Sequence, residues 1–99
     1  MRLCEAEKIQ AYRFLVTMPT VHRFNGLRVV IYPNDHRPAH VHVMGKGCEA
    51  VFRLNAPAGP PELRENYGFG APDLAMIGAE LARQQQRLGV AWKAMHGKY

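Results

Sequence analysis

The chain has 99 residues, enough for one domain with a modest hydrophobic core but too few for a second domain. Hydrophobic residues make up 47% of it, which argues against an intrinsically disordered protein. Thirteen Lys and Arg against eight Asp and Glu give a formal net charge of +5, which favours polyanions such as RNA or an acidic partner protein. The basic residues are dispersed, so no nucleic-acid-binding arm is indicated.

Cysteine usage and hydropathy indicate a cytoplasmic protein. Cys4 and Cys48 lie far apart, so they form neither a CxxC metal pair nor a disulfide framework. No run of about eighteen apolar residues is present, as a membrane span would require. Glu5, Glu7 and Lys8 stand where a signal peptide needs an apolar core. We therefore expect a soluble protein of a reducing compartment, without membrane association.

Two regions are expected along the chain. Residues 1–17 mix charged and apolar side chains in a pattern that fits a short amphipathic helix from about Glu5 to Leu15. We interpret them as an N-terminal appendage whose order depends on docking. Residues 18–99 are expected to form a single α+β domain.

A β-hairpin opens the domain. Thr20–Phe24 and Leu27–Tyr32 are rich in β-branched and aromatic residues, and the Asn25-Gly26 pair between them is typical of a two-residue hairpin turn. In the second strand Leu27, Val29 and Ile31 share one face, because side chains alternate along a strand. That face is expected to be core.

Two further strands follow a proline-rich loop from Pro33 to Pro38. The first begins near His40, and the period of two places Val41 and Val43 in the core. His40 and His42 then share the opposite face. A strand from Glu49 to Leu54 completes an antiparallel meander of three or four strands.

One long helix is expected at the C-terminal end. Residues 55–70 are predicted to be a loop, with a helical turn from Glu62 to Asn66. Ala71-Pro72-Asp73 has the features of a helix start, and Gly97 those of a helix end. An apolar stripe with spacings of three, four and seven joins them through Leu74, Ile77, Leu81, Leu88, Trp92 and Met95. The expected fold is α+β, with this helix packed on one face of the meander.

The chemistry-bearing side chains gather between Asp35 and His42. Asp35, His36, His40 and His42 lie within eight positions. One interpretation is metal-free acid–base catalysis on a phosphodiester, because the ordinary histidine pKa near 6.5 suits both proton donation and acceptance. The phosphate would then be held by one or more of three cations: Arg28, Arg37 and Lys46.

Two other interpretations use the same segment. The H-x-H pair and a third ligand from the loop, giving His36, His40 and His42, would coordinate zinc or another divalent metal. Alternatively the histidines are hydrogen-bonded braces of the turn, with Asp35 capping backbone donors. The residues alone leave the three interpretations open.

A series of motifs links the chain to a known family. From residue 18 to residue 99 they are Met18-Pro19-Thr20, Phe24-Asn25-Gly26, Tyr32 to His36, Pro38-x-His40-x-His42-Val43, Glu49-Ala50-x-Phe52, Asn66-x-Gly68-Phe69 and Trp92-x-x-x-His96-Gly97-x-Tyr99. In this order they resemble a small bacterial family, domain-of-unknown-function family 4160. The resemblance implies a compact α+β domain. It also implies that members are often encoded beside another short protein, as in toxin–antitoxin pairs.

The resemblance carries over only the segment from Asn34 to His42, as the functional segment. The chain departs from the family pattern at Ala39, where a second proline commonly follows, and in the Ala58–Pro61 insertion. Ala71-Pro72 also replaces the usual hydroxyl-bearing helix cap.

The leading hypothesis is a toxin-like component of a toxin–antitoxin module that acts on RNA without a cofactor. His40 and His42 would be general acid and base, oriented by His36 and Asp35. A small cognate protein encoded by a neighbouring gene is the expected partner. The alternatives are a non-catalytic binding module for an acidic partner protein, and a divalent-metal-dependent hydrolase that uses the same histidines.

Overall fold

The computed structural model describes residues 20–99, which form one antiparallel sheet and two helices. The α+β class and the meander are confirmed. The sheet has five strands rather than three or four, and the single long helix is two helices. The predicted appendage, residues 1–17, lies outside the described residues. The elements are β1 (Thr20–Phe24), β2 (Leu27–Val30), β3 (His40–Gly45), β4 (Cys48–Arg53), β5 (Glu62–Tyr67), α2 (Ala71–Arg83) and α3 (Gln85–His96).

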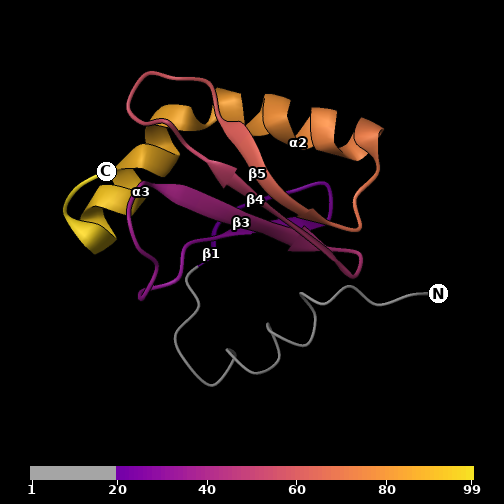
Figure 1. The fold of residues 1–99 in the computed structure, drawn as a ribbon, viewed down its shortest axis with the longest axis horizontal. Helices are drawn as coiled ribbons and strands as arrows, with labels where there is room; N and C mark the ends of the chain where they lie inside the picture. Colours follow the sequence, from indigo (N-terminus) through magenta and orange to yellow (C-terminus); the bar gives the residue numbers. More distant parts are fainter. Residues whose placement is uncertain (1–19) are drawn as a thin grey trace.

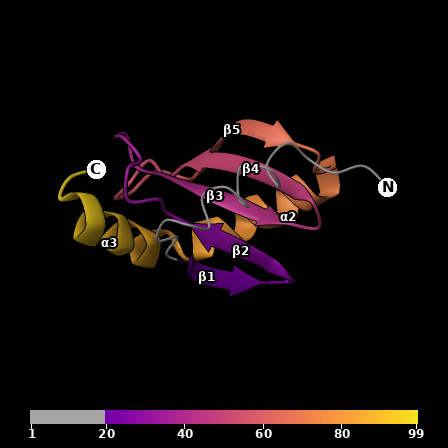
Figure 2. The same ribbon diagram turned by 90° about the horizontal axis from the view of Figure 1, so that it is seen from below.

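The strands lie side by side in chain order, β1-β2-β3-β4-β5, and every neighbouring pair is antiparallel (Figure 2). The hairpin prediction is confirmed at Asn25 and Gly26, whose φ angles of 48° and 77° are the positive values that such a turn requires. The second strand ends at Val30 rather than Tyr32, where the chain turns into the loop before β3.

Both helices lie on one side of the sheet, and the core fills the space between the two layers (Figure 1). The predicted alternation is confirmed, because Val29, Val41 and Val43 are fully buried in this core. The helical stripe is also confirmed. Its four central residues are fully buried and its two outer residues pack against them: Ile77, Leu81, Leu88 and Trp92, with Leu74 and Met95 outside.

The helical region bends at Gln84, and this bend replaces the predicted straight helix. The Gln84 backbone N–H is shared between the carbonyls of Glu80 and Leu81, at 3.1 and 3.2 Å. The Gln85 side-chain amide donates to the carbonyl of Leu54 at 2.8 Å, which ties the start of α3 to the residue that follows β4. The bend turns α3 toward the end of the sheet where β3 begins (Figure 1).

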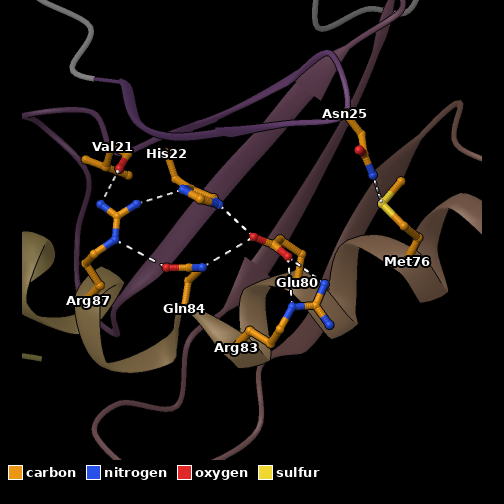
Figure 3. A network of polar contacts seen from close by, with 8 residues as sticks. All are labelled: Val21, His22, Asn25, Met76, Glu80, Arg83, Gln84 and Arg87. Carbon is orange, nitrogen blue, oxygen red and sulfur yellow. Dashed lines mark hydrogen bonds and ion pairs between the residues drawn. The ribbon is translucent and has the colours of Figure 1, made fainter.

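Polar side chains join β1 to the two helices at this bend (Figure 3). Arg87 donates to His22 Nδ1 at 2.7 Å, so His22 donates from Nε2 to the Glu80 carboxylate at 2.8 Å. Arg83 also donates to Glu80, at 2.6 Å. The His22 and Arg83 contacts hold the pKa of Glu80 below its ordinary value. The network therefore ties the edge strand β1 to α2 and α3.

The fifth strand is the largest departure from the prediction. Glu62–Tyr67 was expected to be loop with a helical turn, but it pairs with β4 from Glu49↔Tyr67 to Arg53↔Glu62. All six residues are exposed, so no burial periodicity marks the strand in the sequence. Its conformation follows from the backbone hydrogen bonds that β4 offers.

Candidate metal centre

The loop between β2 and β3 holds the Asp35 carboxylate in a fixed place. The backbone N–H of Asp35 donates to the carbonyl of Tyr32 at 3.1 Å, and Asp35 Oδ2 accepts the N–H of Tyr32 at 3.0 Å. Ala39 ends the loop, with its N–H bonded to the carbonyl of Tyr99 and its carbonyl to the N–H of Leu54. His40 then begins β3 with its backbone fixed from both sides.

Three ligand atoms converge at this point. Asp35 Oδ2 lies 3.6 Å from His40 Nε2 and 3.3 Å from His42 Nε2. All three atoms lie within 4.8 Å of one another, and their side chains keep only 10–14% exposure. His36, which the sequence offered as a third ligand, is exposed and not part of this group. Asp35 takes that place instead.

The outer nitrogen of each imidazole is bound by an acceptor. His40 donates from Nδ1 to the carbonyl of Pro38 at 2.9 Å, and His42 donates from Nδ1 to Glu49 Oε2 at 2.8 Å. Neither acceptor can donate, so both Nδ1 atoms carry protons. In the neutral ring each Nε2 then presents a lone pair toward Asp35. Metal-binding histidines have this arrangement, in which the second nitrogen donates to a carbonyl or carboxylate.

The distances suit a divalent ion. Bonds of about 2.0–2.1 Å in a tetrahedral zinc site place neighbouring ligand atoms roughly 3.3–3.4 Å apart. The contact between His42 and Asp35, at 3.3 Å, matches that spacing, and the contact between His40 and Asp35, at 3.6 Å, exceeds it by a small margin. Two of the three ligand spacings are therefore close to those of a tetrahedral zinc site, and all three ligand atoms lie within 4.8 Å of one another.

Aromatic rings fix the two imidazoles from either side. The Trp92 ring lies 5.2 Å from the His40 ring, and the Tyr32 ring lies 4.8 Å from the His42 ring. Trp92 is itself held, because its Nε1 donates to the carbonyl of Lys98 at 2.6 Å. The bend before α3 therefore contributes to the site by placing Trp92 against His40.

A pocket of about 490 Å³ opens beside the converging atoms. Asp35 and His40 belong both to the three-residue group and to the pocket wall. A ligand in the pocket would therefore lie next to an ion bound by these residues. The full wall consists of Asn34, Asp35, His36, Arg37, Pro38, His40 and Arg64.

The profile of the family described as "Domain of unknown function (DUF4160)" matches residues 26–93, more than half of the chain. The chain belongs to this family. No curated protein and no solved structure matches this chain. Among the helices of the described residues of this DUF4160 protein, none has the length and apolar character to cross a membrane.

The DUF4160 domain brings together only some of the residues predicted to act. Arg37 lines the pocket, whereas Arg28 and Lys46 do not. Arg28 lies on β2, opposite Met44 of β3. Lys46 lies in the turn after β3, about 20 Å from His40 at roughly 3.3 Å per residue. Those two cations are therefore not placed to contact a ligand in this pocket.

Glu49 and Arg64 belong to the site and were not predicted. Alternation along each strand places Glu49 on the face of His42, but only the β3–β4 register brings them into contact. Arg64 lies in the segment predicted to be loop, so nothing local in the sequence indicates it.

Charge coupling within the site sets the protonation of two groups. Burial opposes the charged form of His42, but hydrogen bonds to Asp35 and Glu49 outweigh it and raise the pKa to about 9. Burial likewise opposes ionisation of Asp35, but His40 and His42 hold the pKa of that carboxylate well below its ordinary value. Without a metal ion, His42 is therefore protonated at neutral pH, and an ion would replace the proton on Nε2.

These shifts predict a stability window for protein kept in EDTA. The raised pKa of His42 contributes stability that is complete below about pH 6.5 and is lost as pH rises through about 9. The lowered pKa of Asp35 contributes stability that is complete above about pH 4 and is lost at lower pH. Urea unfolding should give a loss on the order of 3 kcal/mol between pH 6 and pH 10. His42→Gln should remove this dependence, and an equal slope in that variant would contradict the assignment.

Proposed function

We propose that this DUF4160 protein is a divalent-metal-dependent hydrolase whose ion is held by Asp35, His40 and His42. The observation that carries the proposal is the convergence of two Nε2 atoms and one carboxylate oxygen, with each outer nitrogen bonded to an acceptor. Two histidines and one carboxylate are a ligand set of zinc hydrolases, in which water occupies the fourth position.

The chemistry of such a site is hydrolytic. A zinc ion held by Asp35, His40 and His42 would supply water activated for nucleophilic attack at neutral pH. Asp35 and His40 line the pocket, so the nucleophile would lie next to a bound substrate. Glu49 fixes the orientation of His42, and the Pro38 carbonyl fixes that of His40.

Metal-free acid–base cleavage of RNA is the second candidate, and one observation favours it. The raised pKa of His42 supplies a protonated imidazole at neutral pH beside a second histidine. Its Nε2, however, is buried and directed at Asp35 rather than at the pocket. Action on RNA, a toxin role and a small cognate partner protein stay predictions of the sequence.

Ester hydrolysis with and without metal separates the two candidates. The assay uses p-nitrophenyl phosphate, bis(p-nitrophenyl) phosphate, p-nitrophenyl acetate and a labelled RNA, each with zinc, manganese or EDTA. We expect cleavage that needs metal, is lost in EDTA and returns on metal addition. Asp35→Asn should lower kcat/KM at least about 100-fold, because the ion and its hydroxide are lost.

The control is Arg23→Gln, a charge change on exposed Arg23 of the far edge strand β1. It should leave the rate unchanged. RNA cleavage that persists in EDTA and disappears in Asp35→Asn would favour the metal-free candidate. Absence of metal-stimulated hydrolysis on every substrate would remove the hydrolase proposal.

A further inference from the structure

We infer that the pocket beside the metal ligands is a phosphate-monoester subsite, and that Arg64 is its specificity-determining residue. The inference rests on the proposed function, since the phosphate would lie between the ion and two arginines. It adds the substrate class and a residue that the sequence motif does not contain.

A β-bulge places Arg64 at the pocket. Val51 of β4 pairs with Glu65, whereas the next residue, Phe52, pairs with Leu63. Arg64 is therefore the extra residue of β5, without a partner on β4. Bulges redirect side chains and recur beside active sites. Here the redirected side chain forms part of the pocket wall, together with Asp35 and His40.

The pocket wall carries a cationic surplus. Arg37 and Arg64 contribute permanent positive charges, and His36 adds a hydrogen-bonding ring. No carboxylate of residues 20–99 forms an ion pair with either arginine. Asp35 is the one acidic residue of the wall, and it is engaged with His40 and His42. The guanidinium groups of Arg37 and Arg64 are thus available for an anionic ligand.

The number of donors favours a phosphate monoester over a carboxylate. Each guanidinium can donate two parallel hydrogen bonds to a pair of oxygens. Two guanidinium groups and a divalent ion exceed what the two oxygens of one carboxylate accept, whereas a phosphate monoester has three non-bridging oxygens. The pocket volume of about 490 Å³ lies in the range of sites for small organic ligands.

The reaction follows from the proposed hydrolase chemistry. The oxygen of the activated water bonds to phosphorus, and the bond between phosphorus and the ester oxygen breaks. The leaving oxygen takes a proton. The net reaction consumes one water and gives an alcohol and inorganic phosphate, without an oxidant or reductant.

The test is calorimetric titration of the full-length protein, first with zinc and then with inorganic phosphate. We expect Arg64→Gln to bind zinc as the wild type does and to bind phosphate roughly 10- to 100-fold more weakly, from the loss of charged hydrogen bonds. Arg23→Gln makes the same charge change on the opposite edge strand β1 and should leave both affinities unchanged. Equal weakening in both variants, or none in Arg64→Gln, overturns the inference.

Further titrations identify the source of the phosphate and separate the two proposals. Titration with a nucleoside 5′-monophosphate and with a short RNA that carries a 5′-phosphate compares a free monoester with one at the end of a polymer. Equal binding of the same RNA without its phosphate overturns the monoester assignment. If wild type fails to bind zinc, the proposed function falls. Phosphate is then titrated in EDTA. Phosphate binding that is weakened by Arg64→Gln still supports the subsite, whereas phosphate binding that does not depend on Arg64 overturns the inference.

Discussion

Zinc is expected to raise the thermal midpoint of unfolding by about 10–20 °C when its free concentration exceeds the dissociation constant about 100-fold. An ion that binds only the folded chain adds about 2.7 kcal/mol under that condition. Each kcal/mol shifts the midpoint of a domain of this size by roughly 4–8 °C. The effect is large because Asp35, His40 and His42 meet only in the folded chain. Differential scanning calorimetry with and without EDTA measures it.

Matched variants show whether these three residues carry the effect. Asp35→Asn should abolish the zinc-dependent shift while the protein still unfolds cooperatively in EDTA. His36→Gln changes an exposed histidine that is one residue away and outside the group, so it should retain the shift. A shift of equal size in wild type and Asp35→Asn would contradict the site. Loss of the shift in His36→Gln would restore the ligand set predicted from sequence.

His42→Gln is expected to lower the free energy of unfolding in EDTA by about 3–5 kcal/mol at pH 7, the cost of breaking a buried ion pair. His42 lies between Asp35 and Glu49, at 3.3 and 2.8 Å, and all three side chains are mostly buried. Glutamine donates a hydrogen bond but brings no positive charge. The two carboxylates would then lie buried without a cation, and urea unfolding monitors the loss.

Two control variants separate the effect of the lost positive charge of His42 from the effect of its lost packing. The double variant His42→Gln/Glu49→Gln removes one of the two unpaired charges, so it should be more stable than His42→Gln alone. Non-additivity of this kind is expected for residues in direct contact. His36→Gln, on the exposed loop, should stay within about 0.5 kcal/mol of wild type. If His42→Gln lowers the free energy of unfolding by less than about 1 kcal/mol, the ion pairs of His42 with Asp35 and Glu49 contribute little to stability.

The local sequence pattern predicts those parts of the fold in which the conformation or burial of a residue depends on its neighbours in the chain. Asn25-Gly26 indicates the hairpin through backbone conformation, and Val41 and Val43 indicate the core through alternation. The bend at Gln84 is not predicted because the residues on both sides remain helical and the apolar stripe continues through it. β5 is not predicted because every residue in it is exposed, so its formation depends on pairing with β4.

The residues of the candidate site likewise fall into those that the sequence pattern predicts and those that depend on tertiary contacts. Asp35, His40 and His42 lie close together in sequence, so their cluster and the shared face of the histidines are predictable. The choice of Asp35 rather than His36 depends on the turn that bonds Asp35 to Tyr32. Glu49 requires the β3–β4 register, and Arg64 requires the bulge in β5. Such contacts are tertiary, and no periodicity encodes them.

Zinc stoichiometry tests the metal site most directly. Protein stripped with EDTA is dialysed against limiting zinc, and bound metal per chain is measured by elemental analysis for wild type, Asp35→Asn and His36→Gln. The site predicts about one tightly held zinc in wild type and His36→Gln, and none in Asp35→Asn. Wild-type protein that retains no zinc, or Asp35→Asn protein that retains as much as wild type, would contradict it.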